Sequence, residues 1–307
     1  MSAQCNLIID STCDLPLELV QQEGVTRLDF NYIIDGATYK DDFFQSITPK
    51  EFYDNIRNGS TPSTSQVAPA ETEAAFKAAI ESGVPTVYLC FSSGISSNYS
   101  TAYAIWSQLK AEHPEAPIYI VDLLVGSTPE GLLILEALRQ RERGLTAEEM
   151  VAWAEEARFF VQTLFMVDDL DALHRGGRIP ASVAFAGSKL DLKPLLNFDT
   201  NGKLSLAGAS HGRKKGLKQL AAFYEKFHAE NSNVVLIGNA DCEKDADRLS
   251  DLLAKQDESI TVIKHSIGAT IGSHVGAGMI PISFWGSDRR ESLSVADKIA
   301  RKVRKGE

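Results

Sequence analysis

The stretch Thr86-Val87-Tyr88-Leu89-Cys90-Phe91-Ser92-Ser93-Gly94-Ile95-Ser96-Ser97-Asn98-Tyr99 decides the fold. Its first six residues form an apolar run that predicts a buried strand, and a helical pattern begins after the serines. Strand-like and helical segments alternate in the same way through the first half of the chain. Such alternation is typical of an α/β layer fold with a parallel sheet.

The serine-rich turn between this strand and helix is a candidate binding site. Backbone N–H groups in the first turn of a helix lack intrahelical partners, and the positive end of the helix dipole points outward. Together with the hydroxyls of Ser92, Ser93 and Ser96, these groups suit an acidic head group. The alternative is that the serines only cap the helix, since Ser is a preferred N-cap residue. One serine would satisfy that need, and this turn holds more than one.

Composition limits the possible functions. The 307 residues allow two domains and a large core, and the net charge of −10 argues against nucleic acid as a main partner. The four cysteines are far apart in the sequence, which indicates neither a zinc site nor a disulfide scaffold. No apolar run is long enough for a signal sequence or a membrane span. We therefore expect a cytoplasmic protein without stable membrane insertion.

The expected elements divide the chain into two α/β domains, residues 1–160 and 161–307. Capping boxes begin helices after Thr48 and Thr146, and Asn201-Gly202 suits a hairpin turn. The segment near 59–68 is expected to contribute to a site between the domains. Strands are predicted at Cys5–Ile9, Thr26–Ile34, Tyr39, Thr86–Phe91, Ile118–Val121, Val161–Val167, Val234–Ile237, Thr261–Lys264 and Ile280–Trp285. Helices are predicted at Pro16–Glu23, from Pro49 to Gly59, Pro69–Ser82, Ser97–Ala111, Pro129–Arg143, Ala147–Arg158, through Leu173, Gly212–Glu230, Glu243–Lys255 and at the charged C-terminus.

Four further polar segments are open to a functional and a structural interpretation. Hydroxyl-rich Gly59–Gln66 is either part of a site or an ordinary linker, and Asp10–Asp14 is either a ligand contact or a helix cap. The loop Gly268–Gly278 contains four glycines and His274, which is more often a structural hydrogen-bonding residue than a functional one. The turn Gly176-Gly177 between two arginines is either a chain reversal or a docking point.

No catalytic signature is present in the sequence. It contains no Gly-x-Ser-x-Gly elbow, no Walker A motif, no His-Glu-x-x-His motif and no close pair of carboxylates with an acid–base role. We predict a binding protein with no catalytic residues, no metal and no cofactor.

Taken in order, six motifs resemble the DegV family of bacterial fatty-acid-binding proteins over nearly the whole chain. The resemblance implies two α/β domains with one long-chain fatty acid in a buried tunnel between them. It also implies that a dihydroxyacetone-kinase-like partner phosphorylates the bound carboxylate, as part of a fatty acid kinase system. The motifs are Asp10-Ser11-Thr12, Thr64-Ser65-Gln66, Ser92-Ser93-Gly94-Ile95-Ser96, Val121-Asp122, Gly176-Gly177-Arg178-Ile179 and His274-x-Gly-x-Gly.

The same resemblance places the carboxylate on Thr64 and Ser96, with His274 close to the head group. Ser65 and Ser93 are the neighbouring hydroxyl candidates. Five positions depart from the family pattern. Ser97-Asn98 stands where the family usually has Gly-Thr, and Leu123 stands where it usually has Ser. Ala277 takes the place of a usual Pro, and His211 the place of a frequent Arg.

The leading hypothesis is a non-catalytic carrier that presents a fatty acid to a kinase. Arg178, Arg213 and Lys214 are the expected docking contacts in this acidic chain. One alternative is a lipid or acyl-phosphate hydrolase that uses Ser96 and His274, although no acidic third member can be identified. The other is a carrier that acts without any kinase.

Overall fold

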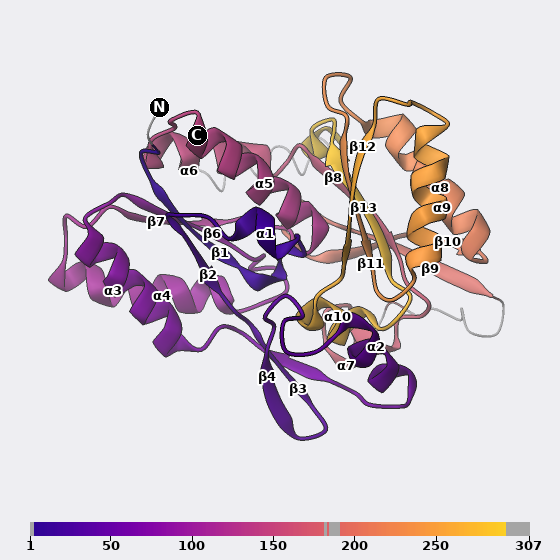
Figure 1. Ribbon diagram of the computed structural model, residues 1–307, viewed down its shortest axis with the longest axis horizontal. Helices are drawn as coiled ribbons and strands as arrows, with labels where there is room; N and C mark the ends of the chain where they lie inside the picture. The colour runs from indigo at the N-terminus through magenta and orange to yellow at the C-terminus, as the bar shows by residue number, and fades with distance from the viewer. Residues whose placement is uncertain (1–2, 181–182, 184–190, 293–307) are drawn as a thin grey trace.

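The computed structural model describes residues 3–180, 183 and 191–292, and it has two large sheets and one small one (Figure 1). The first large sheet is parallel, with the order β2-β1-β6-β7. β6 is central and buried at every residue, as the apolar run predicts. The strands are β1 (Asn6–Asp10), β2 (Val25–Leu28), β6 (Thr86–Cys90) and β7 (Ile118–Asp122).

The prediction of one strand over Thr26–Ile34 is wrong, because this segment contains two strands in different sheets. β2 ends at Leu28 in the parallel sheet, and β3 (Asn31–Ile34) pairs antiparallel with β4 (Ala37–Lys40) and β5 (Ser63–Ser65). Between them the Phe30 N–H donates to Ser11 Oγ and the Phe30 carbonyl accepts from the Asp41 N–H. These bonds to non-neighbouring residues turn the chain from one sheet to the other.

The second large sheet has the order β10-β9-β8-β13-β11-β12 and is antiparallel except for the pair β11–β12. The predicted hairpin joins β9 to β10, and Gly202 in its turn has a φ of +75°. The predicted boundary near residue 160 falls just before β8. The division into domains at that point stays a prediction. The strands are β8 (Val161–Met166), β9 (Leu192–Phe198), β10 (Leu204–His211), β11 (Val234–Asn239), β12 (Thr261–Ser266) and β13 (Ile280–Trp285).

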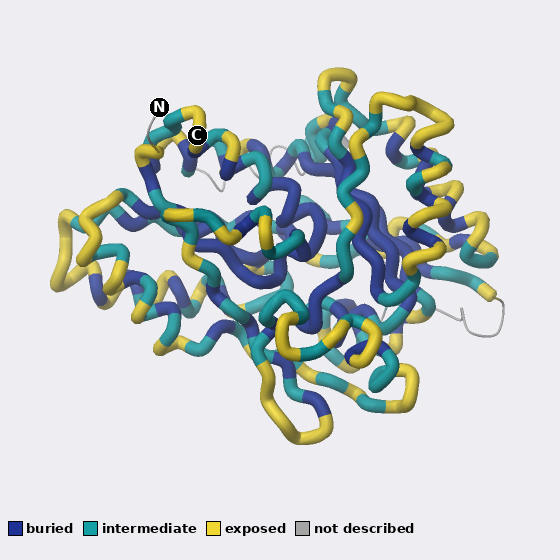
Figure 2. Tube along the Cα trace, in the orientation of Figure 1, coloured by how far each residue is buried: buried dark blue, intermediate teal, exposed yellow. Residues whose placement is uncertain are grey.

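Helices cover the outer face of each large sheet and also fill the space between the two sheets (Figures 1 and 2). α3 and α4 cover the outer face of the parallel sheet, and α8 and α9 cover the outer face of the second. α5 lies between the two sheets, and ten of its residues are buried, which is the burial pattern of a central helix. The helical elements are η1 (Ser11–Cys13), α1 (Leu17–Val20), α2 (Pro49–Arg57), α3 (Pro69–Ser82), α4 (Asn98–Glu112), α5 (Thr128–Glu142), α6 (Ala147–Ala157), α7 (Asp171–Arg175), α8 (Arg213–Phe227), α9 (Glu243–Ala254), α10 (Ala269–Val275) and η3 (Arg289–Ser292).

Two further predictions need correction. The expected glycine-rich loop Gly268–Gly278 contains the helix α10, whose first amides are bound by Asp14 and Asp41 from distant parts of the chain. The predicted helix Pro16–Glu23 is reduced to α1, a single turn followed by Gly24 at a φ of +73°. Both capping boxes are confirmed, and the expected C-terminal helix lies outside the described residues beyond η3.

Candidate ligand-binding site

A cavity lies between the two large sheets and contains about 680 Å³ of empty space, part of it open to solvent. Both halves of the chain supply its walls. The apolar lining residues are Phe30, Phe91, Ile95, Pro129, Phe165, Leu173, Phe198, Leu204, Ile271, Val275, Met279 and Pro281.

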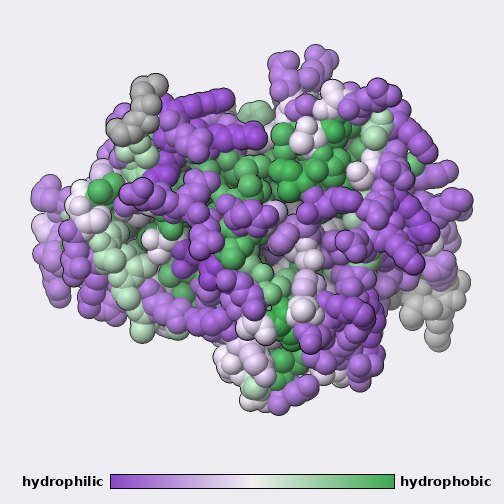
Figure 3. Space-filling view, viewed as in Figure 1, coloured by the Kyte–Doolittle hydropathy of each residue, from purple (hydrophilic) through white to green (hydrophobic). Residues whose placement is uncertain are grey.

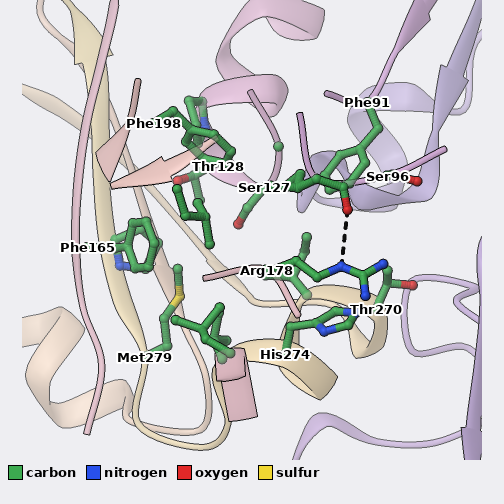
Figure 4. Close-up of a pocket in the computed structure, with 18 of the residues that line it drawn as sticks. Phe91, Ser96, Ser127, Thr128, Phe165, Arg178, Phe198, Thr270, His274 and Met279 are labelled. Carbon is green, nitrogen blue, oxygen red and sulfur yellow. Dashed lines mark hydrogen bonds between the residues drawn. The ribbon is translucent and has the colours of Figure 1, made fainter. Parts of the chain in front are cut away.

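Arg178, His274 and Ser96 lie at one end of this cavity, while Ser127, Thr128 and Thr163 add hydroxyls elsewhere on its wall. Figure 4 shows Ser96, Arg178 and His274 on one side, and Phe165, Phe198 and Met279 on the other. We call the first group, together with Thr64 and Thr270, the polar end. Its members come from β5, the turn before α4, the turn after α7, and α10. A ligand that fits this arrangement has a polar head and an apolar body.

His274 on α10 is neutral in this environment. Burial, together with the nearby charge of Arg178, lowers the pKa of its imidazole to about 4. Its Nε2 is 2.7 Å from Thr64 Oγ1, which joins α10 to β5. Its Nδ1 faces Gly176, where an added Cβ would lie only 2.2 Å away, and has no hydrogen-bond partner among the described residues. The close approach explains why a glycine stands at that position.

Arg178 is the cation of the polar end. Its Nε donates to the Ile95 carbonyl at 3.1 Å, and its Nη1 donates to the Gly176 carbonyl (Figure 4 draws the first bond). No acidic side chain within the described ranges forms an ion pair with it. Burial alone lowers the pKa of its guanidinium. A partly buried arginine without a counter-ion, next to a neutral histidine, favours an anionic ligand.

Ser96 lies in the turn that precedes α4. Its Oγ accepts a hydrogen bond from the Asn98 N–H at 3.2 Å, which leaves its O–H able to donate to a ligand. Ser97, at the N-cap position of α4, makes no side-chain capping bond. Ser92 has a different task, because its Oγ donates to the Gly202 carbonyl of the β9–β10 hairpin. The serines of this turn therefore do more than cap one helix.

The structure brings Thr64, Ser96 and His274 together at the cavity, but not Ser65 and Ser93. Successive side chains of a strand point to opposite faces, so Thr64 faces the cavity while Ser65 is exposed. Ser93 is also exposed, and its N–H donates to Asp122 Oδ1. Neither hydroxyl lines the cavity.

The three expected docking residues have different surroundings. Arg178 lines the cavity. Arg213 forms ion pairs with Asp168 and Asp245, whereas Lys214 is exposed. Their role in docking stays a prediction.

Comparison with known proteins decides the family. The model for "Uncharacterised protein, DegV family" matches residues 4–286. The chain belongs to the DegV family. A DegV domain-containing protein of Clostridium perfringens is 34% identical over 284 residues, which is 92% of this chain and 98% of the relative.

Solved DegV structures share the fold. A fatty-acid-binding DegV family protein from Streptococcus agalactiae is 28% identical with a TM-score of 0.81, covering 92% of this chain and 99% of its own. A DegV family protein from Thermus thermophilus, whose structure is described as fatty acid binding, is 28% identical with a TM-score of 0.79. The match covers 92% of this chain and 100% of that chain. DegV, a fatty acid binding protein from Bacillus subtilis, is 25% identical with a TM-score of 0.77, covering 93% and 100%.

The five residues that depart from the expected DegV pattern differ in how far they are buried. Asn98 is buried, and its Nδ2 donates to both oxygens of Asp10 at 3.2 and 3.3 Å and to Tyr88 Oη at 2.8 Å. Leu123 is fully buried in the core between the parallel sheet and α5. The other three are more accessible. Ser97 donates to Gln66 Oε1, Ala277 follows α10, and His211 is exposed at the end of β10.

Sequence reasoning missed the role of Arg178 in the DegV cavity wall. Its position after two glycines indicated a turn, which the φ of +68° at Gly177 confirms. The direction of its side chain depends on the Ile95 carbonyl, which is 83 positions away in sequence. Ser127 and Thr128 at the start of α5 also line the cavity and had no recognisable signal. Among the described residues, no helix is suited to span a membrane and no metal-binding cluster is found.

Proposed function

We propose that this DegV protein binds one long-chain fatty acid, with its carboxylate at the polar end and its acyl chain along the apolar walls. The single observation that carries this proposal is Arg178, a partly buried cation without an acidic partner at the end of an apolar cavity. The fatty-acid-binding DegV proteins of Streptococcus agalactiae and Thermus thermophilus support it.

The polar end offers a carboxylate several donors. Arg178 supplies a charge-assisted hydrogen bond, and the hydroxyls of Ser96 and Thr64 supply neutral ones. Because His274 is neutral, the net charge of the polar end is that of one arginine, which a single carboxylate balances. Each methylene buried in the cavity contributes about 0.8 kcal/mol.

Native mass spectrometry of protein purified from a bacterial host tests this proposal. The expected spectrum shows about one bound fatty acid per chain, which is released and identified after denaturation. Spectra that show only ligand-free protein, even after incubation with palmitate or oleate, would contradict the proposal.

A carrier fits the geometry better than the hydrolase alternative. His274 Nε2 is bonded to Thr64 and not to Ser96, so the pair needed to activate a serine nucleophile is not formed. No carboxylate among the described residues accepts from His274 Nδ1 to orient its ring. A turnover assay with Ser96→Ala as control should show no hydrolysis of acyl esters or acyl phosphates above background.

The carrier would present its fatty acid in the cytoplasm to a dihydroxyacetone-kinase-like partner that phosphorylates the carboxylate. This part of the proposal rests on the family resemblance and on the partial opening of the cavity to solvent. A radiolabelled ATP assay with the cognate kinase tests it. Acyl-phosphate formation that requires both proteins is the expected result, and its absence with a kinase active on another carrier would favour a stand-alone carrier.

A further inference from the structure

Two buried carboxylates hold the start of α10. Asp14 Oδ1 accepts from the Gly268 N–H at 2.8 Å. Asp41 uses both oxygens, accepting from the Ala269 N–H at 3.2 Å and the Thr270 N–H at 3.0 Å. Asp14 lies in the Asp10–Asp14 motif that the site leaves unexplained, and Asp41 follows β4.

These carboxylates are unusual because no cation pairs with them. Asp14 and Asp41 are 3% and 2% exposed, and neither forms an ion pair with a described residue. Burying a charge is costly unless hydrogen bonds offset the loss of water. Here the free amides at the start of a helix supply those bonds, because Gly268 at the N-cap has no side chain to do so.

The helix held in this way carries one face of the polar end. Thr270 and His274 are one turn apart on α10, and both line the cavity. Ile267, which directly precedes the N-cap residue Gly268, is fixed too, since the Tyr53 hydroxyl donates to its carbonyl at 2.7 Å. The second oxygen of Asp14 accepts from Ser127 Oγ at 2.5 Å, and Ser127 lines the cavity from α5. Asp14 thus ties α10 to the opposite wall of the same cavity.

We propose that Asp41 and Asp14 are positioning residues, which hold the start of α10 so that His274 keeps its hydrogen bond to Thr64 and the Thr64 hydroxyl meets the ligand carboxylate in a fixed arrangement. The inference rests on the fatty-acid binding proposed above and goes beyond it. Neither aspartate lines the cavity, so each acts through α10 and not by contact with the ligand.

Two variants disturb the start of α10 by different routes. Asp41→Asn leaves one side-chain oxygen to accept from the two amides of Ala269 and Thr270, and its new NH₂ group faces the amide that has lost its acceptor. Gly268→Ala keeps both carboxylates but places a Cβ 2.8 Å from Asp14 Oδ1 and 3.2 Å from Asp41 Oδ1, and it remains informative if Asp41→Asn does not fold. Asp245→Asn is the matched control, because it alters a largely buried carboxylate that binds Arg213 and Arg248 away from the cavity.

The readout compares palmitate with hexadecanol, which has the same chain length and no carboxylate. Both α10 variants should lose about tenfold in palmitate affinity, the effect of one hydrogen bond, while hexadecanol affinity stays within about twofold. Asp245→Asn should change neither ligand. In a His274→Ala background, the loss of palmitate affinity caused by Gly268→Ala should largely disappear, because the residue through which it acts is gone.

Equal losses for palmitate and hexadecanol, or an undiminished effect in the His274→Ala background, would overturn the inference and reduce the two aspartates to a structural role. A parent protein that binds neither ligand would refute the proposed function itself, and this inference with it. Normal palmitate selectivity in both α10 variants would overturn the inference alone.

Discussion

Arg178 is the residue on which the chemistry of the site depends most. Its guanidinium is fixed by the carbonyls of Ile95 and Gly176, so two backbone oxygens hold it in place before any ligand arrives. Preorganised donors of this kind lose less entropy on binding than mobile ones. The hydroxyls of Thr64 and Ser96 add neutral donors of smaller effect.

We therefore predict a ranked loss of fatty-acid affinity. Thr64→Ala and Ser96→Ala should each weaken binding more than tenfold, since one donor to a charged acceptor contributes on the order of 1.5–3 kcal/mol. Arg178→Gln should weaken binding further, because it removes the positive charge that balances the carboxylate. Displacement of a fluorescent fatty acid measures these affinities, and thermal unfolding checks that the fold is intact. Parent-like binding by Arg178→Gln would contradict the proposed orientation.

Asp10 is one of several buried carboxyls that should make the stability of the protein depend on pH. Burial raises the pKa of this carboxyl to about 7, although hydrogen bonds from Phe91, Tyr88 and Asn98 oppose the shift. Between its ordinary pKa and pH 7 the folded state keeps a proton that the unfolded state has released. The stabilisation is therefore complete at or below about pH 4 and is lost as the pH rises through 7.

Chemical denaturation should accordingly give a larger free energy of unfolding at pH 6 than at pH 8. Asp10→Asn should reduce this dependence, because Asn does not titrate, while Asp14, Asp41 and Glu130, whose pKa values are also raised by burial, account for the remainder. If the free energy of unfolding changes between pH 6 and pH 8 by the same amount in the parent and in Asp10→Asn, Asp10 does not titrate in this range.

At the scale of elements, the sequence predicts those whose determinants are local. β6 and α4 were predictable because an apolar run and a helical pattern adjoin each other. The helix α10 was not, because its first amides are bound by Asp14 and Asp41, which precede it by more than 200 residues. The break between β2 and β3 depends in the same way on Ser11 and Asp41.

The site shows the same limit. Thr64, Ser96 and His274 were expected together from the family resemblance, and the structure places all three around one cavity. Ser65 and Ser93 could not be separated from them, because strand register and turn geometry decide which hydroxyl faces the cavity.

The packing of α7 on α10 gives a prediction at this scale. Gly176→Ala would place a Cβ 2.2 Å from His274 Nδ1, so the imidazole or α7 must move. Overpacking of this kind costs about 1–3 kcal/mol of stability, and the displaced imidazole should also weaken fatty-acid binding. Gly208→Ala is the control, since its added Cβ meets no atom within 4 Å. Unchanged stability and affinity in Gly176→Ala would contradict the observed close contact.

At the scale of the whole molecule, the protein is a set of layers with its cavity between two sheets. Figure 3 shows that hydrophilic residues cover much of the viewed face, while apolar groups gather over the middle of the molecule. A partner that phosphorylates the carboxylate has to approach the polar end. Rim charges mainly set the rate of such encounters and their sensitivity to salt.

Lys214 provides the cleanest test of docking, because it is exposed and lies outside the cavity wall. Lys214→Glu should slow kinase-dependent phosphorylation at low salt while lipid binding stays unchanged. Adding Arg213→Glu should enlarge the effect, although it also breaks the ion pairs with Asp168 and Asp245. Identical phosphorylation rates for the parent and the double variant would exclude this face as the docking surface.

The orientation of the bound fatty acid is the central claim, and one crystal structure tests it most directly. The protein should be crystallised with a long-chain fatty acid that carries bromine at its terminal carbon, so that anomalous scattering locates the chain end. We predict the carboxylate within hydrogen-bond distance of Arg178 and Ser96, and the bromine among Phe165, Phe198 and Met279. A carboxylate among these apolar residues with bromine beside Arg178, or a ligand bound outside the cavity, would contradict the claim.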